Sequence, residues 1–96
     1  MTQYILLIQD NLKSDPTGEE WKNFFTAAQQ SGLFQGGSEI GNRVLIGDTE
    51  SAKPTDHIVG FMRFDADDKQ EILKLLELHP TVIHGGSVEL CELPQS

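Results

Sequence analysis

The chain has 96 residues, 15 acidic and seven basic, and its formal net charge of -8 repels phosphate backbones and anionic lipid headgroups. Nucleic acid and membrane surfaces are therefore not expected partners, and the longest apolar run, residues 5–8, is far shorter than the roughly 20 residues of a membrane span. A hydrophobic fraction of 38% is typical of a folded domain, so we expect one domain over residues 1–96 in a soluble, cytoplasmic protein.

The first predicted elements are a strand and a helix. Residues 3–10, QYILLIQD, form an apolar run of strand length in which neither face is polar, so this strand should be covered on both sides. Thr17 and Glu20 have the spacing of a capping box, which predicts a helix start, and Gly32 is the expected stop. One apolar stripe follows between them, formed by Trp21, Phe24, Phe25 and Ala28.

The second half of the chain repeats this pattern. Residues 33–48 predict a strand with a bulge or bend and then a short extra strand or hairpin arm, and residues 48–56 predict a surface loop. Residues 57–66 alternate as a strand, after which Asp65 or Asp67 is placed to cap a second helix. Pro80 should end that helix and leave His79 in its last turn, before a final strand over residues 87–93.

The order strand, helix, strand, strand, helix, strand is that of an α+β ferredoxin-like βαββαβ sandwich. Two helices cover only one face of such an antiparallel sheet, yet the first strand is apolar on both faces. A twin sheet from a second subunit would cover the other face. The sequence therefore predicts a homodimer with its sheets packed face to face.

Two residues are candidates for catalysis. His79 holds the fourth place of the apolar stripe of the second helix. It either caps the last carbonyl groups of that helix or acts as a general acid or base at the rim of a pocket. Asp10 ends the first strand, where it either solvates a turn or pairs with a histidine as an oriented base. The distance between the two residues does not follow from the sequence.

The remaining polar residues give weaker signals. Arg43 and Arg63 are candidates for binding a substrate carboxylate, although either also suits a plain surface ion pair. His57 and His84 flank loops and should be exposed, and the three histidines lack the spacing of a metal site. The single cysteine, Cys91, is interpreted as a half-buried strand residue. No metal or cofactor site is predicted.

The segments YILLIQD, GGSEIG, VGFMRFDADD, LELHP and SVELCELP together resemble the YCII-related (YciI-like) family of the dimeric α/β-barrel superfamily, from Tyr4 to Pro94. In this resemblance Asp10 matches the aspartate that closes the first strand, and His79 with Pro80 matches the HP that ends the second helix. The histidine that such members carry in the first helix, and the DGPF motif of another branch, have no equivalent here.

The resemblance implies a ferredoxin-like fold, a homodimer and a pocket between sheet and helices near the dimer interface, in a family whose activities are mostly unassigned. Two hypotheses follow. The first is a cofactor-free enzyme that carries out proton-transfer or elimination chemistry on a small cyclic or aromatic metabolite, with His79 moving the proton and Asp10 orienting or polarising. The second, motivated by the missing histidine of the first helix, is a non-catalytic dimer that binds a small ligand or a partner.

Overall fold

The computed structural model describes residues 1–94 and contains a four-stranded antiparallel sheet in the order β2-β3-β1-β4. The strands are β1 (Thr2–Gln9), β2 (Phe34–Glu39), β3 (Ile58–Ala66) and β4 (Val88–Leu93). The two longest, β1 and β3, are the central pair of the sheet. This is the predicted ferredoxin-like arrangement.

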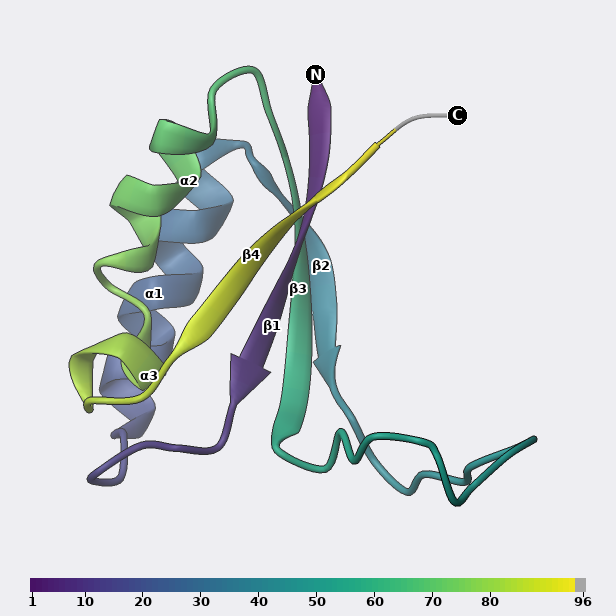
Figure 1. Cartoon of the computed structure of the whole chain (residues 1–96). Coiled ribbons are helices and arrows are strands. Elements are labelled where there is room, and N and C mark those ends of the chain that lie inside the picture. Colours follow the sequence, from purple (N-terminus) through teal and green to yellow (C-terminus); the bar gives the residue numbers. More distant parts are fainter. Residues whose placement is uncertain (95–96) are drawn as a thin grey trace.

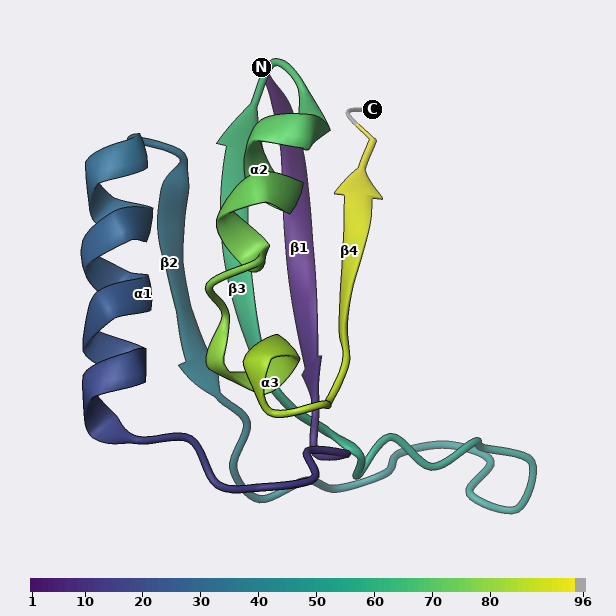
Figure 2. The same ribbon diagram turned by 90° about the vertical axis from the view of Figure 1, so that its left-hand side faces the viewer.

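Three helices, α1 (Gly18–Ser31), α2 (Lys69–Leu76) and the short α3 (Pro80–Ile83), lie on one face of the sheet, as Figures 1 and 2 show. The predicted capping box at the start of α1 is present, because Thr17 and Glu20 exchange hydrogen bonds between side chain and backbone. Gly32 ends this helix in the left-handed conformation at φ 74°, as predicted.

The second helical region differs from the prediction. Asp68 caps α2, in place of Asp65 or Asp67, and α2 ends at Leu76. His79 has an extended backbone and is the N-cap of α3, with Pro80 at the first helical position. A proline disfavours the helical conformation in the residue before it, so Pro80 separates His79 from α2 and starts the next helix.

The alternation of side chains along each strand divides them between two faces. The helix-side face holds the fully or almost fully buried side chains of the core, including Tyr4, Leu6, Ile8, Met62 and Phe64. The opposite face carries Ile5, Leu7 and Phe61, which are only partly buried because no helix covers them. The prediction that β1 is apolar on both faces is therefore confirmed, and one of these two faces is not covered by any helix of the same chain.

Between β2 and β3 the chain leaves the sheet as an arm over residues 40–57, which projects to the side of the sheet that faces away from the helices (Figure 1). The predicted bulge in β2 is present, since the register shifts between Phe34 and Gly36. Of the two alternatives predicted for the second apolar piece, an extra strand or a hairpin arm, no extra strand forms: Val44, Leu45 and Ile46 lie in the arm without regular structure, and between 59% and 90% of their surface is exposed. Within residues 1–94, no helix is both long and apolar enough to cross a membrane.

Candidate functional site

A pocket lies on the helix side of the sheet, between the start of α1, the beginning of α3 and the adjoining ends of β1, β2 and β3. Figure 2 shows how these elements meet. Its volume is about 740 Å³, within the roughly 300–1,000 Å³ of typical small-molecule sites. The lining is mostly apolar and includes Ile8, Leu12, Pro16, Trp21, Phe25, Phe34, Ile40 and Met62. Val59 and Phe61 also border the pocket, although strand alternation directs their side chains to the uncovered face.

One wall of the pocket is aromatic. Trp21 and Phe25 stand one helical turn apart on α1 and stack with ring centroids 5.8 Å apart. Phe25 in turn lies 6.0 Å from Phe34 of β2, whose ring packs 5.7 Å from the buried Phe64. Within the predicted stripe of α1, Phe24 and Ala28 are therefore the core residues, while Trp21 and Phe25 are available to a ligand. Rigid rings held in this way favour flat apolar partners.

Glycines form part of the sheet surface beneath this wall. Gly37 of β2 pairs with Met62, and a Cβ atom at position 37 would lie 2.3 Å from the carbonyl oxygen of Phe61. Gly60 of β3 pairs with Glu39, so the side chain of Glu39 stands on the helix-side face with no side chain opposite it. Because neither glycine has a side chain, no side chain from positions 37 and 60 fills the pocket above the sheet.

His79 lies directly behind the pocket. Its ring is fully buried and packs edge-on against two aromatic rings of α1, with centroids 5.2 Å from Trp21 and 4.7 Å from Phe24. Trp21 lines the pocket and His79 does not. The predicted burial of His79 is confirmed, but the predicted capping of α2 is wrong: its side chain caps α3, with Nδ1 accepting from the backbone N–H of Thr81 at 3.1 Å.

This contact fixes the proton on the His79 ring. Burial lowers the pKa of His79 from 6.5 to about 4, so the ring is neutral at pH 7. Because Nδ1 accepts a hydrogen bond, the single ring proton is on Nε2. Nε2 has no hydrogen-bond partner within residues 1–94. The arrangement leaves a neutral N–H donor buried beside the pocket without an acceptor, at a typical cost of about 1–3 kcal/mol.

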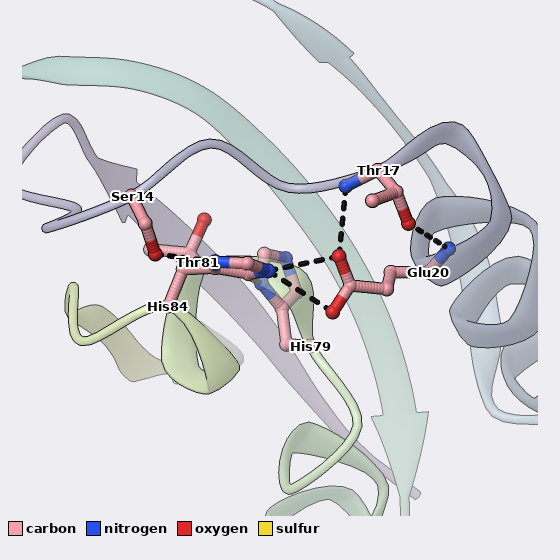
Figure 3. A network of polar contacts seen from close by, with 6 residues as sticks. All are labelled: Ser14, Thr17, Glu20, His79, Thr81 and His84. Atoms are coloured by element: carbon pink, nitrogen blue, oxygen red, sulfur yellow. Dashed lines mark hydrogen bonds and ion pairs between the residues drawn. The ribbon is translucent and has the colours of Figure 1, made fainter.

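His84 is held in a polar network and is not an exposed loop residue, which corrects the prediction. Its Nε2 lies 2.8 and 3.0 Å from the two carboxylate oxygens of Glu20, and its Nδ1 lies 2.6 Å from the hydroxyl of Ser14 (Figure 3). The backbone N–H of Thr17 donates to Glu20 and, with His84, holds the pKa of Glu20 below its usual value. The network ties the loop after β1, the start of α1 and the end of α3 together next to the pocket.

The other predicted site residues are not gathered around His79. Asp10 is exposed at the end of β1, and its backbone N–H donates to His57, which is exposed as predicted. Arg43 donates to the carbonyl oxygens of Thr55 and Ile58 and so closes the base of the arm. Arg63 is on the uncovered face of the sheet. No hydrogen bond joins Asp10 to His79 within the described residues, so their pairing stays a prediction.

The resemblance implied a pocket between sheet and helices, but sequence reasoning missed the aromatic lining of this pocket and the His84 network. The pair Trp21 and Phe25, four residues apart at the beginning of a helix, was the available signal for an aromatic wall. The contribution of Gly37 and Gly60 depends on strand pairing, and the approach of His84 to Glu20 joins residues 64 positions apart. Cys91 is half-buried in β4, as predicted.

No protein-family model and no curated protein sequence matches this chain. Among solved structures, it is similar to 5-chloro-2-hydroxyhydroquinone dehydrochlorinase (TftG) from Burkholderia phenoliruptrix AC1100 in complex with 2,5-dihydroxybenzoquinone. The identity is 12% and the TM-score 0.57, over 100% of this chain and 96% of the other. It is also similar to At3g17210 from Arabidopsis thaliana, at 12% identity and a TM-score of 0.44 over the same shares.

The likeness to TftG concerns the fold. The chain has a ferredoxin-like α+β fold, which it shares with TftG and which agrees with the fold class expected from the sequence. At 12% identity it says nothing of shared chemistry. The finer assignment to the YCII-related family stays a prediction.

Proposed function

We propose that this chain binds a small, planar cyclic or aromatic metabolite in the pocket between α1 and the sheet, and that it is a cofactor-free enzyme which carries out proton-transfer or elimination chemistry on that molecule. The observation that carries the proposal is the pocket of about 740 Å³ with the rings of Trp21, Phe25 and Phe34 among its lining residues. The similar fold of TftG, a protein named as a dehydrochlorinase and solved with 2,5-dihydroxybenzoquinone, supports a flat ring as the ligand.

The state of His79 suggests its role in such a reaction. A neutral imidazole with its proton on Nε2 does not act as a base through that atom, but it donates a hydrogen bond to an oxygen that gains negative charge. Trp21 packs on His79 and lines the pocket, so this role requires Trp21 to move aside and open a path from Nε2 to a bound ligand. We therefore assign charge stabilisation to His79 in this proposal.

A base is then needed for the proton, and Asp10 is the candidate. In an elimination from a ring-chlorinated hydroquinone, the keto tautomer carries hydrogen and chlorine on one tetrahedral ring carbon. The base removes a proton from a ring hydroxyl, the oxygen electron pair forms a carbonyl group, the ring double bond shifts to the tetrahedral carbon and chloride departs. Asp10 directly follows Gln9, which lines the pocket, so its carboxylate is at the correct end of β1 for this role. The proposal exchanges the roles expected for the two residues from the sequence.

A non-catalytic ligand-binding protein is the second candidate function. Two observations favour it: His79 is fully buried beneath Trp21, and the Asp10 carboxylate is exposed without a hydrogen bond to His79. In this alternative the aromatic pocket binds the same class of ligand, and His79 serves only to cap α3 and fill the core.

Homodimerisation is also part of the proposal. The uncovered face of the sheet carries partly buried apolar side chains, and the arm projects on the same side (Figure 1). A second copy related by a two-fold axis would cover this face with the same face of its own sheet. Arg63 would then lie in the subunit interface. The apolar residues of this surface are Ile5, Leu7, Val59, Phe61, Cys91 and Leu93.

The experiment that separates the two functions is a turnover assay on ring-chlorinated hydroquinones, including 5-chloro-2-hydroxyhydroquinone, with chloride release and mass spectrometry as readouts. The enzyme proposal predicts chloride release that is lost in Asp10→Asn while quenching of Trp21 fluorescence by the ligand is retained. Quenching without any product would establish the binding alternative. Neither quenching nor product, at millimolar ligand, would refute both.

A further inference from the structure

The charge of the pocket points to the class of molecule that it accepts. Among the residues that line it, Glu39 alone is ionisable; the others are apolar, glycine, or neutral polar residues such as Gln9, Ser38 and Thr81. Within residues 1–94, no lysine or arginine side chain lines the pocket. A ligand that enters therefore meets aromatic rings, a few neutral hydrogen-bonding groups and one carboxylate.

The strand register places Glu39 at the pocket. Glu39 is the last residue of β2, on the helix-side face, directly opposite Gly60. Gly60 has no side chain to stand beside Glu39, whose own side chain is exposed and lines the pocket. Glu39 takes part in no ion pair within residues 1–94, so no cation of the described chain neutralises it.

The two arginines that the sequence offered for binding an acidic ligand do not compensate for this charge. Arg43 donates to the backbone carbonyl groups of Thr55 and Ile58, and neither arginine lines the pocket. The formal charge of -8 adds a field of the same sign as Glu39. An anionic group at this site would lose hydration and gain no counter-charge.

We infer that Glu39 is a specificity-determining residue, and that the pocket selects neutral or cationic planar aromatic molecules and rejects aromatic carboxylates. The inference rests on the proposed function, since it assumes that the aromatic pocket is the ligand site. A ligand with an amino, amidine or hydroxyl donor at the Glu39 end of the pocket satisfies that carboxylate. A ligand carboxylate at the same place is repelled.

Benzamidine, benzamide and benzoate test this inference, because they have nearly the same shape and size but carry charges of about +1, 0 and -1. Their dissociation constants for the full chain are measured at low salt from the NMR shift of the Trp21 indole N–H. We expect benzoate to bind about tenfold more weakly than benzamide, the effect of two like charges about 6 Å apart in a medium of intermediate dielectric. Benzamidine should bind more tightly than benzamide.

Two comparisons separate charge from shape. Glu39→Gln should bring the affinities of benzamide and benzoate within about twofold of each other, and about 1 M salt should do the same in the wild type because the Debye length falls to about 3 Å. The matched control is Glu50→Gln, which removes one exposed carboxylate from the arm, outside the pocket lining, and should leave the tenfold ratio unchanged.

The outcomes distinguish this inference from the proposed function. If all three molecules bind with equal affinity, or if Glu39→Gln leaves the benzoate penalty in place, the charge selection is refuted while the aromatic site stands. If none of the three shifts the Trp21 resonance at millimolar concentration, the ligand site itself is refuted, and the proposed function with it.

Discussion

The burial of His79 predicts a specific loss of stability in mild acid. In the unfolded chain His79 has its ordinary pKa of 6.5, whereas in the folded protein burial lowers the pKa to about 4. Between these two values the unfolded state binds a proton that the folded state does not. The stabilisation of the folded state by the neutral ring is therefore complete above pH 6.5 and declines as the pH falls towards 4.

The magnitude follows from the two pKa values. At pH 5 the unfolded ring is almost fully protonated and the folded ring almost fully neutral, which lowers the free energy of unfolding by about 2 kcal/mol relative to pH 7. This is a large share of the roughly 5–15 kcal/mol that stabilises a typical domain. Below pH 4 both states bind the proton and His79 contributes no further loss.

The assay is urea unfolding followed by Trp21 fluorescence at pH 7 and pH 5, for the wild type and two variants. His79→Asn keeps an acceptor for the Thr81 N–H, and His79→Phe keeps the ring volume, so a folding defect in one does not prevent the test. Each variant should lose about 2 kcal/mol less than the wild type on acidification, because carboxylate effects are common to all three chains.

His57→Asn is the matched control, because this ring is exposed and its removal should leave the pH dependence as it is in the wild type. The reasoning would be refuted if the wild type and both His79 variants lost the same stability between pH 7 and pH 5. That result would mean that water reaches the His79 ring in the folded protein.

Three further predictions concern the fold and its assembly. Gly37→Ala should lower the free energy of unfolding by about 2 kcal/mol, because the new Cβ atom meets the Phe61 carbonyl oxygen. Gly41→Ala, where no atom lies within 4 Å of the new Cβ, should cost far less in the same urea titration. Equal effects of the two substitutions would contradict the account of the pocket floor. Thr17→Ala should cost about 1 kcal/mol through loss of the α1 cap, and an unchanged urea midpoint would show that the capping box is not needed. Light scattering at micromolar concentration should give a molar mass twice the 10.7 kDa of one chain. Leu7→Asp on the uncovered face should give the mass of a monomer and leave the helical circular dichroism unchanged. A monomeric wild type would rule out the dimer.

Much of the fold could be predicted because its signals are local. The capping box at Thr17, the glycine stop at Gly32 and the alternation of residues 57–66 each depend on neighbours within a few positions. Combined with the order of the elements, these signals were sufficient for the ferredoxin-like topology. The apolar residues on both faces of β1 also indicated that one face would lack a cover within a single chain.

The candidate site could be predicted only in part. Burial of His79 followed from its place in the apolar stripe, but the effect of Pro80 on the preceding backbone turned that residue from the end of one helix into the start of the next. The second apolar piece of residues 33–48 formed no strand, because the arm finds no strand partner within the described chain. The shape of the pocket depends on where a residue without a side chain, such as Gly60, lies beside a residue of the neighbouring strand. The strand register sets these pairs, and the register does not follow from the sequence alone.

The central claim is that a small planar aromatic molecule binds on the helix side of the sheet, against α1. The most direct test is to titrate hydroquinone into the ¹⁵N-labelled chain and follow the backbone and indole N–H resonances by NMR. The account predicts shifts concentrated at the Trp21 indole and at the amides of Gly37 and Gly60, all in the pocket lining. Shifts at Leu7 and Cys91 on the uncovered face, or no shifts at saturating ligand, would contradict it.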